Sequence, residues 1–315
     1  MLPKFDNYKV NFLLQKRELS HSRSRLDTNM ITTVVWSIII TLLLVLIVYQ
    51  CLEALKKRRN VDKIAVIYLR GMITDDKDYL AQDQINFDSV KHKISGLDLR
   101  GLKAVILNIS SPGGLPVQTD RISTFIRNYF QGLPIICFVE EIAASGGYWL
   151  ACSAQHIYAT RSSVVGSIGV ISQSFGFSAA LDKLGVERRI ITAGSCKNIM
   201  DPFSPIDDDE VSVMTNMLSE IHQHFIDHVK ESRGDRLKAG EEELFNGKVW
   251  TGAKAAELGL VDGVEHMETY ITETWGHNVQ IIMPKERENM LSKLLNFRRF
   301  PRMFPTSHDR FHIDV

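Results

Sequence analysis

The apolar residues of this chain form one long uncharged run near the N-terminus, followed by short apolar segments that alternate with amphipathic ones. The uncharged run, Ile31–Tyr49, is about as long as a bilayer core requires, which is roughly 20 residues. Trp36 and Tyr49 lie in the run at positions that suit aromatic side chains at the membrane interfaces. The run therefore predicts a transmembrane anchor over residues 31–50.

A cleaved signal peptide is the alternative interpretation of this run. No small-x-small cleavage site follows it, and the chain continues instead towards the basic cluster Lys56-Lys-Arg-Arg59. We therefore expect an uncleaved anchor between a polar tail, residues 1–30, and a basic linker, residues 51–62. The 20 residues before the run carry 4 Lys or Arg and the 20 after it carry 6. This difference only weakly favours a cytoplasmic C-terminal domain and leaves the orientation open.

From residue 63 onward, short β-branched runs alternate with segments of helical periodicity. The runs predict strands at 64–69, 104–109, 134–139, 156–159, 189–192 and 280–283. The periodic segments predict helices at 87–94, 119–130, 177–184, 207–232 and 252–258. Strands separated by helices indicate βαβ units and a mainly parallel sheet that is covered on both faces. We expect one α/β domain over residues 63–283 and a basic C-terminal tail over residues 284–315.

The longest predicted helix, 207–232, has an apolar stripe of the kind that faces a protein core. Its members are Val211, Met214, Leu218, Ile221, Phe225 and Val229. His224 and His228 on the same helix have the i,i+4 spacing of a metal pair, but they lack the intervening Glu of the zinc-protease motif. We favour a solvated helix face for these histidines and predict no metal site.

Charge and cysteine content narrow the classes of function. Lys and Arg together number 37, as do Asp and Glu, so the formal net charge is zero. Because the chain has no basic excess, we expect no nucleic-acid partner. The 4 cysteines are widely spaced, without the paired spacing of a metal site. We predict no cofactor.

Ser145 falls where a predicted strand passes into a helix, in the stretch Glu141–Cys152. The free N–H groups and the positive end of the helix dipole point outward at such a junction, so a hydroxyl there can act as a nucleophile. Gly146 has no Cβ to block a substrate, and its amide could donate to a developing oxyanion. The alternative is that Ser145 only caps the helix, which is common for serine at this position.

The stretch Ser110-Ser-Pro-Gly-Gly114 ends another predicted strand, and ligands of open α/β sheets bind at the carboxyl ends of strands. Gly113 and Gly114 either turn backbone N–H groups towards a substrate or form a simple turn.

A serine nucleophile needs a base, and no histidine here has an obvious triad context. Ser–Lys pairs are a known variant. Lys197 is flanked by small and apolar residues, and burial would favour its neutral amine. A surface lysine without a role is the alternative. Ser167, in a glycine-flanked turn, could hydrogen-bond to an amine and orient it.

Taken together, these stretches resemble the signal peptide peptidase A family, which comprises Ser–Lys serine peptidases and includes the shorter SohB-type members. The resemblance covers roughly residues 61–283. It rests on five segments in this order: 110–114, 144–148, 166–170, 197–203, and 249–253 together with 257–262.

The resemblance implies that Ser145 is the nucleophile and Lys197 the general base. It further implies that Ser167 positions Lys197 and that the amides of Gly114 and Gly146 form the oxyanion hole. The implied architecture is a ClpP/crotonase-like fold in a ring-shaped homo-oligomer, in which the Ser and Lys of one site come from adjacent subunits.

The implied function is a membrane-anchored serine endopeptidase of the bacterial inner membrane. Its substrates would be released signal peptides and other extended apolar segments. Two alternatives stay open. One is an acyl-CoA-type enzyme on the same fold, acting on a thioester without a serine nucleophile. The other is a catalytically silent membrane scaffold.

Overall fold

The computed structural model describes residues 30, 32–53, 61–75 and 84–284. The predicted polar and basic tails therefore lie almost entirely outside the described residues, as does most of the basic linker. The chain divides into two compact units, Met1–Val61 and Asp62–Val315, which are considered separately.

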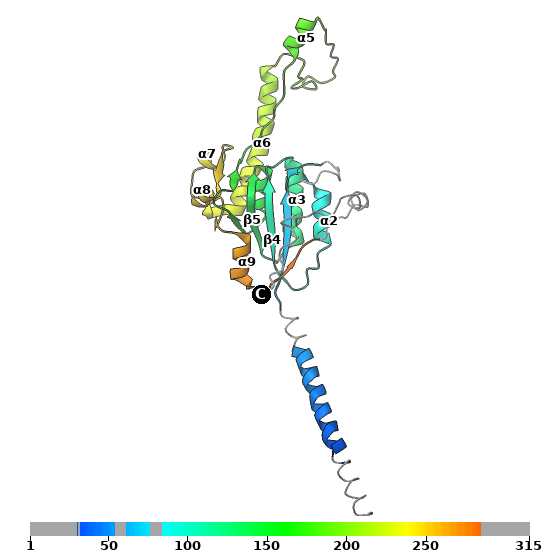
Figure 1. Ribbon diagram of the computed structural model, residues 1–315. Helices are drawn as coiled ribbons and strands as arrows, with labels where there is room; N and C mark the ends of the chain where they lie inside the picture. Colours follow the sequence, from blue (N-terminus) through cyan, green and yellow to red (C-terminus); the bar gives the residue numbers. More distant parts are fainter. Residues whose placement is uncertain (1–29, 31, 54–60, 76–83, 285–315) are drawn as a thin grey trace, which may run out of the picture. The chain divides into compact units, whose positions relative to one another are not determined.

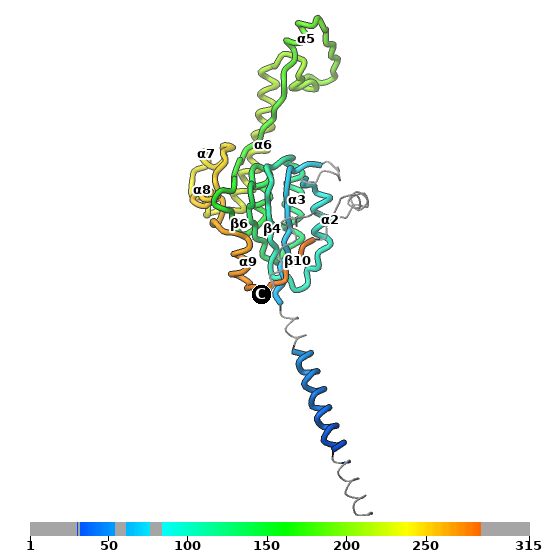
Figure 2. The backbone as a smooth tube through the Cα atoms, in the orientation of Figure 1, coloured from blue at the N-terminus to red at the C-terminus, as the bar shows by residue number. Residues whose placement is uncertain are grey.

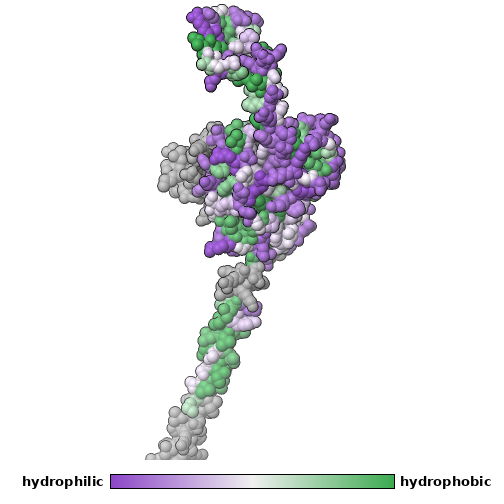
Figure 3. All heavy atoms as spheres, turned by 180° about the vertical axis from the view of Figure 1, so that it is seen from behind, coloured by the Kyte–Doolittle hydropathy of each residue, from purple (hydrophilic) through white to green (hydrophobic). Residues whose placement is uncertain are grey.

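In the first unit, Thr32–Glu53 forms a single helix over the predicted anchor. In the part of the chain that the structure describes, this helix alone is long and apolar enough to cross a membrane. The face of the helix seen in Figure 3 is predominantly apolar.

The second unit is built on an 8-stranded sheet whose main path runs β10-β1-β4-β5-β6-β9, with every pairing along it parallel. β7 pairs with β5 in parallel, and β8 pairs with β7 antiparallel. This sheet confirms the predicted mainly parallel α/β class. Its strands are β1 (Lys63–Arg70), β4 (Leu102–Ser111), β5 (Ile135–Ala144), β6 (His156–Ala159), β7 (Val164–Gly166), β8 (Val249–Thr251), β9 (Gly263–Val264) and β10 (Gln280–Ile282). A separate small sheet pairs β2 (Met72–Ile73) with β3 (Gln84–Ile85).

Helices lie on both faces of the sheet (Figures 1 and 2). The helices of the described residues in this unit are α2 (Phe87–Ser95), α3 (Pro116–Tyr129), α4 (Gly146–Ala151), α5 (Ser178–Leu184), α6 (Asp208–Arg233), α7 (Glu241–Leu244), α8 (Gly252–Glu257) and α9 (Met267–Trp275), with a 3-10 turn, η1, at Gly234–Arg236. Of these, α5 lies away from the sheet (Figure 1). Alternate residues of β1 belong to different cores: Ala65 and Ile67 to the large one with α3 and α4, Ile64 and Val66 to the smaller one with α9. Burial on both faces explains why these strands read as continuous apolar runs.

The predicted strand at 189–192 is wrong. These residues form no regular structure, and Ile191 is 99% exposed. An apolar β-branched run becomes a strand only where another strand offers hydrogen-bond partners, and no strand of the described chain pairs with this run.

The predicted stripe of α6 is buried only near its C-terminal end, at Phe225 and Val229. The N-terminal part of α6 extends beyond the sheet, and α5 lies near its far end (Figure 1). We call residues 171–207 the arm. Within the arm, the Phe177 amide donates a hydrogen bond to the Pro202 carbonyl, 2.6 Å. The arm is also bonded to α6, because the Met200 amide donates to the Glu210 carboxylate, 3.1 Å. No residue of α5 is buried.

Candidate active site

Ser145 occupies a strained junction between β5 and α4. Its φ is 51° and its ψ is −124°, a region in which a non-glycine residue is disfavoured by about 1–3 kcal/mol. The junction is held by hydrogen bonds from the Ser145 amide to the Gly166 carbonyl, 2.8 Å, and from the Tyr148 amide to the Ser145 carbonyl, 2.9 Å. The Ser145 side chain makes no capping hydrogen bond. The structure therefore does not support the reading of Ser145 as a helix cap.

Glycines allow the turn after β4 to pack directly against this junction. A Cβ on Gly113 would lie 2.8 Å from both the Ser145 Cβ and the Gly146 nitrogen. A Cβ on Gly147 would meet the carbonyl oxygen of Ser111. Only residues without a side chain permit this backbone contact, which joins the two predicted glycine motifs into one site.

The amides of Gly114 and Gly146 lie beside each other at this contact. The Gly114 nitrogen is 3.3 Å from the position that a Cβ on Gly146 would occupy. Gly114 is fixed by β2, because the Ile73 amide donates to the Gly113 carbonyl, 2.8 Å, and the Leu115 amide donates to the Ile73 carbonyl, 2.9 Å. Among the described residues, neither glycine amide has a hydrogen-bond acceptor. Two free donors next to a serine hydroxyl are the arrangement that stabilises an oxyanion.

A cavity of about 120 Å³ opens beside Ser145. Pro116 of α3, Trp149 of α4, and Ile221 and Phe225 of α6 contribute to its walls. These side chains are apolar or aromatic, so the cavity suits an apolar side chain of a bound ligand.

Ser167 lies close to the same junction. It directly follows Gly166, whose carbonyl accepts the Ser145 amide, and it also has a positive φ of 51°. Its own amide donates to the Lys248 carbonyl, 2.7 Å. The structure thus gathers four of the predicted site residues around one turn: Ser145, Ser167, Gly114 and Gly146.

Lys197 lies elsewhere, on the arm. It is exposed, it sits in a turn closed by a hydrogen bond from its amide to the Gly194 carbonyl, 3.2 Å, and it does not line the cavity at Ser145. Within a single described chain, the predicted base is therefore not brought to the predicted nucleophile.

Sequence reasoning missed the role of His228. The prediction of a solvated face is wrong for this residue, which is only 7% exposed and stacks on Trp149 with ring centroids 4.8 Å apart. Burial lowers the pKa of His228 and so favours the neutral ring. Its position three residues after Phe225, on the apolar side of α6, was the available signal.

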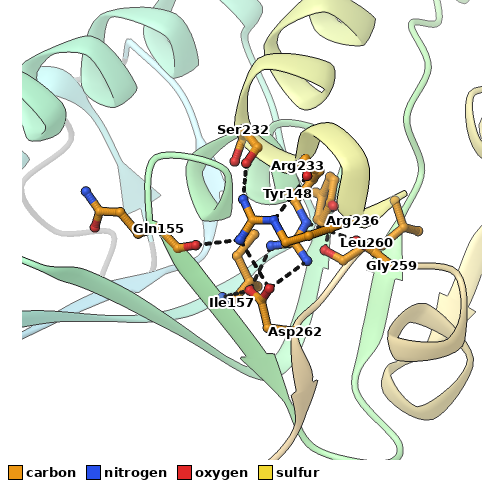
Figure 4. A network of polar contacts seen from close by, with 9 residues as sticks. All are labelled: Tyr148, Gln155, Ile157, Ser232, Arg233, Arg236, Gly259, Leu260 and Asp262. Carbon is orange, nitrogen blue, oxygen red and sulfur yellow. Dashed lines mark hydrogen bonds and ion pairs between the residues drawn. The ribbon is translucent and has the colours of Figure 1, made fainter. Parts of the chain in front are cut away.

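A buried polar network also holds α4 in place (Figure 4). The Tyr148 hydroxyl donates to the Leu260 carbonyl, 2.7 Å, and Arg233 donates to the Gly259 carbonyl, 3.0 Å, and to Asp262, 2.8 Å. Burial acts to raise the pKa of Asp262, but hydrogen bonds from Arg233 and from the Ile157 amide outweigh it, so the pKa is lowered.

Comparison with known proteins relates part of this chain to a known family. The α/β sheet carries a serine at a strained strand-to-helix turn, beside two amides without an acceptor among the described residues, and this arrangement suits acyl transfer. The family model described as Peptidase family S49 matches residues 128–278. The chain is similar to this family over just under half of its length.

Named relatives match only part of their own length. The chain is 30% identical over 206 residues to Protease 4 of Haemophilus influenzae, covering 64% of this chain and 33% of the relative. It is 30% identical over 210 residues to the chloroplastic serine protease SPPA of Arabidopsis thaliana, covering 64% and 30%. It is also 43% identical over 194 residues to a Brucella abortus protein named Na(+)/H(+) antiporter NhaA, covering 61% and 26%. The chain thus spans about a quarter to a third of these relatives.

Among solved structures, a membrane-bound stomatin-specific protease in complex with a substrate peptide is similar at 17% identity. The TM-score is 0.45, and the match covers 76% of this chain and 98% of that one. Because this similarity is low, the fold of this chain is assigned from its own sheet.

Proposed function

We propose that this protein is a membrane-anchored serine endopeptidase in which Ser145 is the nucleophile and Lys197 the general base. The observation that carries the proposal is the Ser145 turn: a hydroxyl without a capping bond, on a strained backbone, beside two amides that have no acceptor among the described residues. The match of residues 128–278 to a peptidase family supports peptide bonds as the substrate. We propose the bacterial inner membrane as its location, with Thr32–Glu53 as the anchor.

The proposed mechanism gives each of these groups one role. Neutral Lys197, oriented by the Ser167 hydroxyl, removes the proton from Ser145 Oγ, which attacks the peptide carbonyl carbon. The amides of Gly114 and Gly146 donate to the oxyanion, each contributing about 3 kcal/mol to the barrier reduction. Lys197 then protonates the leaving amine, and a water that it deprotonates releases the acyl group from Ser145.

We further propose that Lys197 reaches Ser145 of a neighbouring subunit in a closed ring. The support is its position on an arm that exposes large apolar side chains in the described chain, including Ile171, Phe175 and Leu184, each at least 74% exposed. Apolar residues are visible among polar ones on the arm in Figure 3. Exposed apolar surface of this kind marks interaction sites, and head-to-tail contacts between identical subunits close into rings.

The substrates we propose are extended apolar segments, such as released signal peptides. The apolar walls of the cavity beside Ser145 support this choice. A membrane anchor would keep the site near peptides that leave the bilayer.

A fluorophosphonate probe on the detergent-solubilised full-length protein tests the proposal. We expect labelling of Ser145, loss of labelling in Ser145→Ala, and loss of peptide hydrolysis in both Ser145→Ala and Lys197→Ala. Lys183→Ala, also an exposed lysine of the arm, serves as the control and should stay active. Near-normal turnover in Lys197→Ala would show that the dyad is wrongly assigned. Thioester turnover without labelling would favour the acyl-CoA-type enzyme, and neither activity would favour the scaffold.

A further inference from the structure

We propose that His228 is a positioning residue that fixes the Trp149 wall of the cavity beside Ser145, and so sets which substrate side chain is accepted next to the cleaved bond. This inference rests on the proposed peptidase function. It concerns a residue that takes no part in the chemistry and that lies behind the cavity wall.

The hydrogen-bond pattern at the end of α4 leaves a place for His228. The amides of Cys152, Ser153 and Ala154 donate to the carbonyls of Tyr148, Leu150 and Ala151, respectively. None of these three amides donates to the Trp149 carbonyl. His228 Nε2 lies 3.0 Å from that carbonyl oxygen. Because a carbonyl can only accept, Nε2 carries the hydrogen. His228 thus satisfies a buried acceptor that the helix end does not.

The rings reinforce this contact. The Trp149 indole stacks on His228 at 4.8 Å and 20°, and on Phe225 at 5.0 Å and 29°. Trp149 and Phe225 both line the cavity, whereas His228 does not. His228 therefore holds the indole through its carbonyl and its ring together, and the indole defines part of the cavity wall.

The contact between His228 and Trp149 also connects α4 to the arm, because α6 contacts both. α6 contributes Ile221 and Phe225 to the cavity, while Glu210 near its start accepts the Met200 amide, three residues beyond Lys197. His228 hydrogen-bonds this helix to the Trp149 carbonyl of α4. A change at His228 should therefore alter the cavity shape without removing any group that touches the reacting atoms.

Three variants separate the contributions of the ring and the hydrogen bond. His228→Phe keeps an aromatic ring but loses the N–H donor, and His228→Gln supplies an N–H donor without the ring. His224→Phe is the control, because His224 is exposed on the same helix. Each is compared with wild type on two peptides that differ only in the residue before the cleaved bond, Ala or Leu.

In His228→Phe the Trp149 carbonyl loses its donor, so the indole wall of the cavity is no longer held in place. We therefore expect the ratio of kcat/KM for the Leu peptide over the Ala peptide to fall about tenfold. His228→Gln should recover part of this loss, and His224→Phe should keep the wild-type ratio. A role in stability alone would lower both activities equally and leave the ratio unchanged, which would overturn the proposal. If His228→Phe does not fold, an unchanged ratio in His228→Gln would overturn it instead. A wild-type protein that cleaves neither peptide and is not labelled at Ser145 would refute the proposed function itself.

Discussion

The guanidinium of Arg233 is completely buried against the carboxylate of Asp262, with 2.8 Å between Nη1 and Oδ2 (Figure 4). The same carboxylate accepts the amide of Ile157 at the start of β6, 2.7 Å. This ion pair therefore joins the end of α6 to the sheet, directly beneath the helix that follows Ser145.

Removing the carboxylate should destabilise the protein strongly. Asp262→Ala leaves the Arg233 charge buried without its partner, and we expect the free energy of unfolding to fall by about 3 kcal/mol or more. Chemical denaturation of the detergent-solubilised protein measures this loss. The exposed pair Lys254–Glu257 is the control, and Glu257→Gln should leave the denaturation midpoint unchanged. Equal midpoints for both variants would contradict the structural role of Asp262.

Stability should also depend on pH through His228. Burial lowers its pKa, the hydrogen bond to the Trp149 carbonyl partly opposes this, and Arg127 lowers the pKa further, while Glu231 and Asp120 act to raise it. Because the unfolded chain binds the proton more readily, stability is fully present above about pH 6.5 and decreases as the pH falls towards the folded pKa.

This contribution can be isolated by substitution. Denaturation midpoints measured between about pH 7.5 and pH 5 should fall less steeply in His228→Gln than in wild type. His224→Gln, at an exposed position, should retain the wild-type slope. A slope unchanged in His228→Gln would show that another group is responsible.

Gly114 should tolerate no side chain. A Cβ there would overlap the carbonyl of Ile73, and its φ is +153°. We expect Gly114→Ala to lose fluorophosphonate labelling and peptide hydrolysis, because either the β2 contact or the oxyanion amide must move. Gly132→Ala is the control: its φ is also positive, at +87°, but nothing lies within 4 Å of the added Cβ. We expect it to lose only about 1 kcal/mol of stability and to remain active.

A site shared between subunits predicts complementation. Ser145→Ala and Lys197→Ala should each be inactive alone. Co-expressed in mixed rings, they should regain up to about one quarter of wild-type activity, since about one interface in four combines an intact Ser145 with an intact Lys197. Hydrolysis by the purified mixture, with each variant alone as control, measures this. Mixed assemblies without activity would argue against sharing.

Much of the architecture was predictable because it depends on local pattern. β1, β4 and β5 are buried on both faces and therefore read as uninterrupted apolar runs. Locally, the side chain of Thr251 caps α8 by accepting the amide of Lys254. The position of Ser145 at the end of β5 also followed from periodicity, because strand and helix periods change there.

The remaining features depend on contacts between distant segments. Ser145 has a positive φ, and Gly113 packs directly against its turn; no sequence window contains this contact. His224 and His228 are both histidines of α6, but His224 is exposed and His228 is buried, because α4 packs against α6 at His228. The apolar runs thus determine which segments become strands and helices. The long-range packing decides which polar side chains meet, because periodicity reports burial along one element and carries no information about what lies across from it.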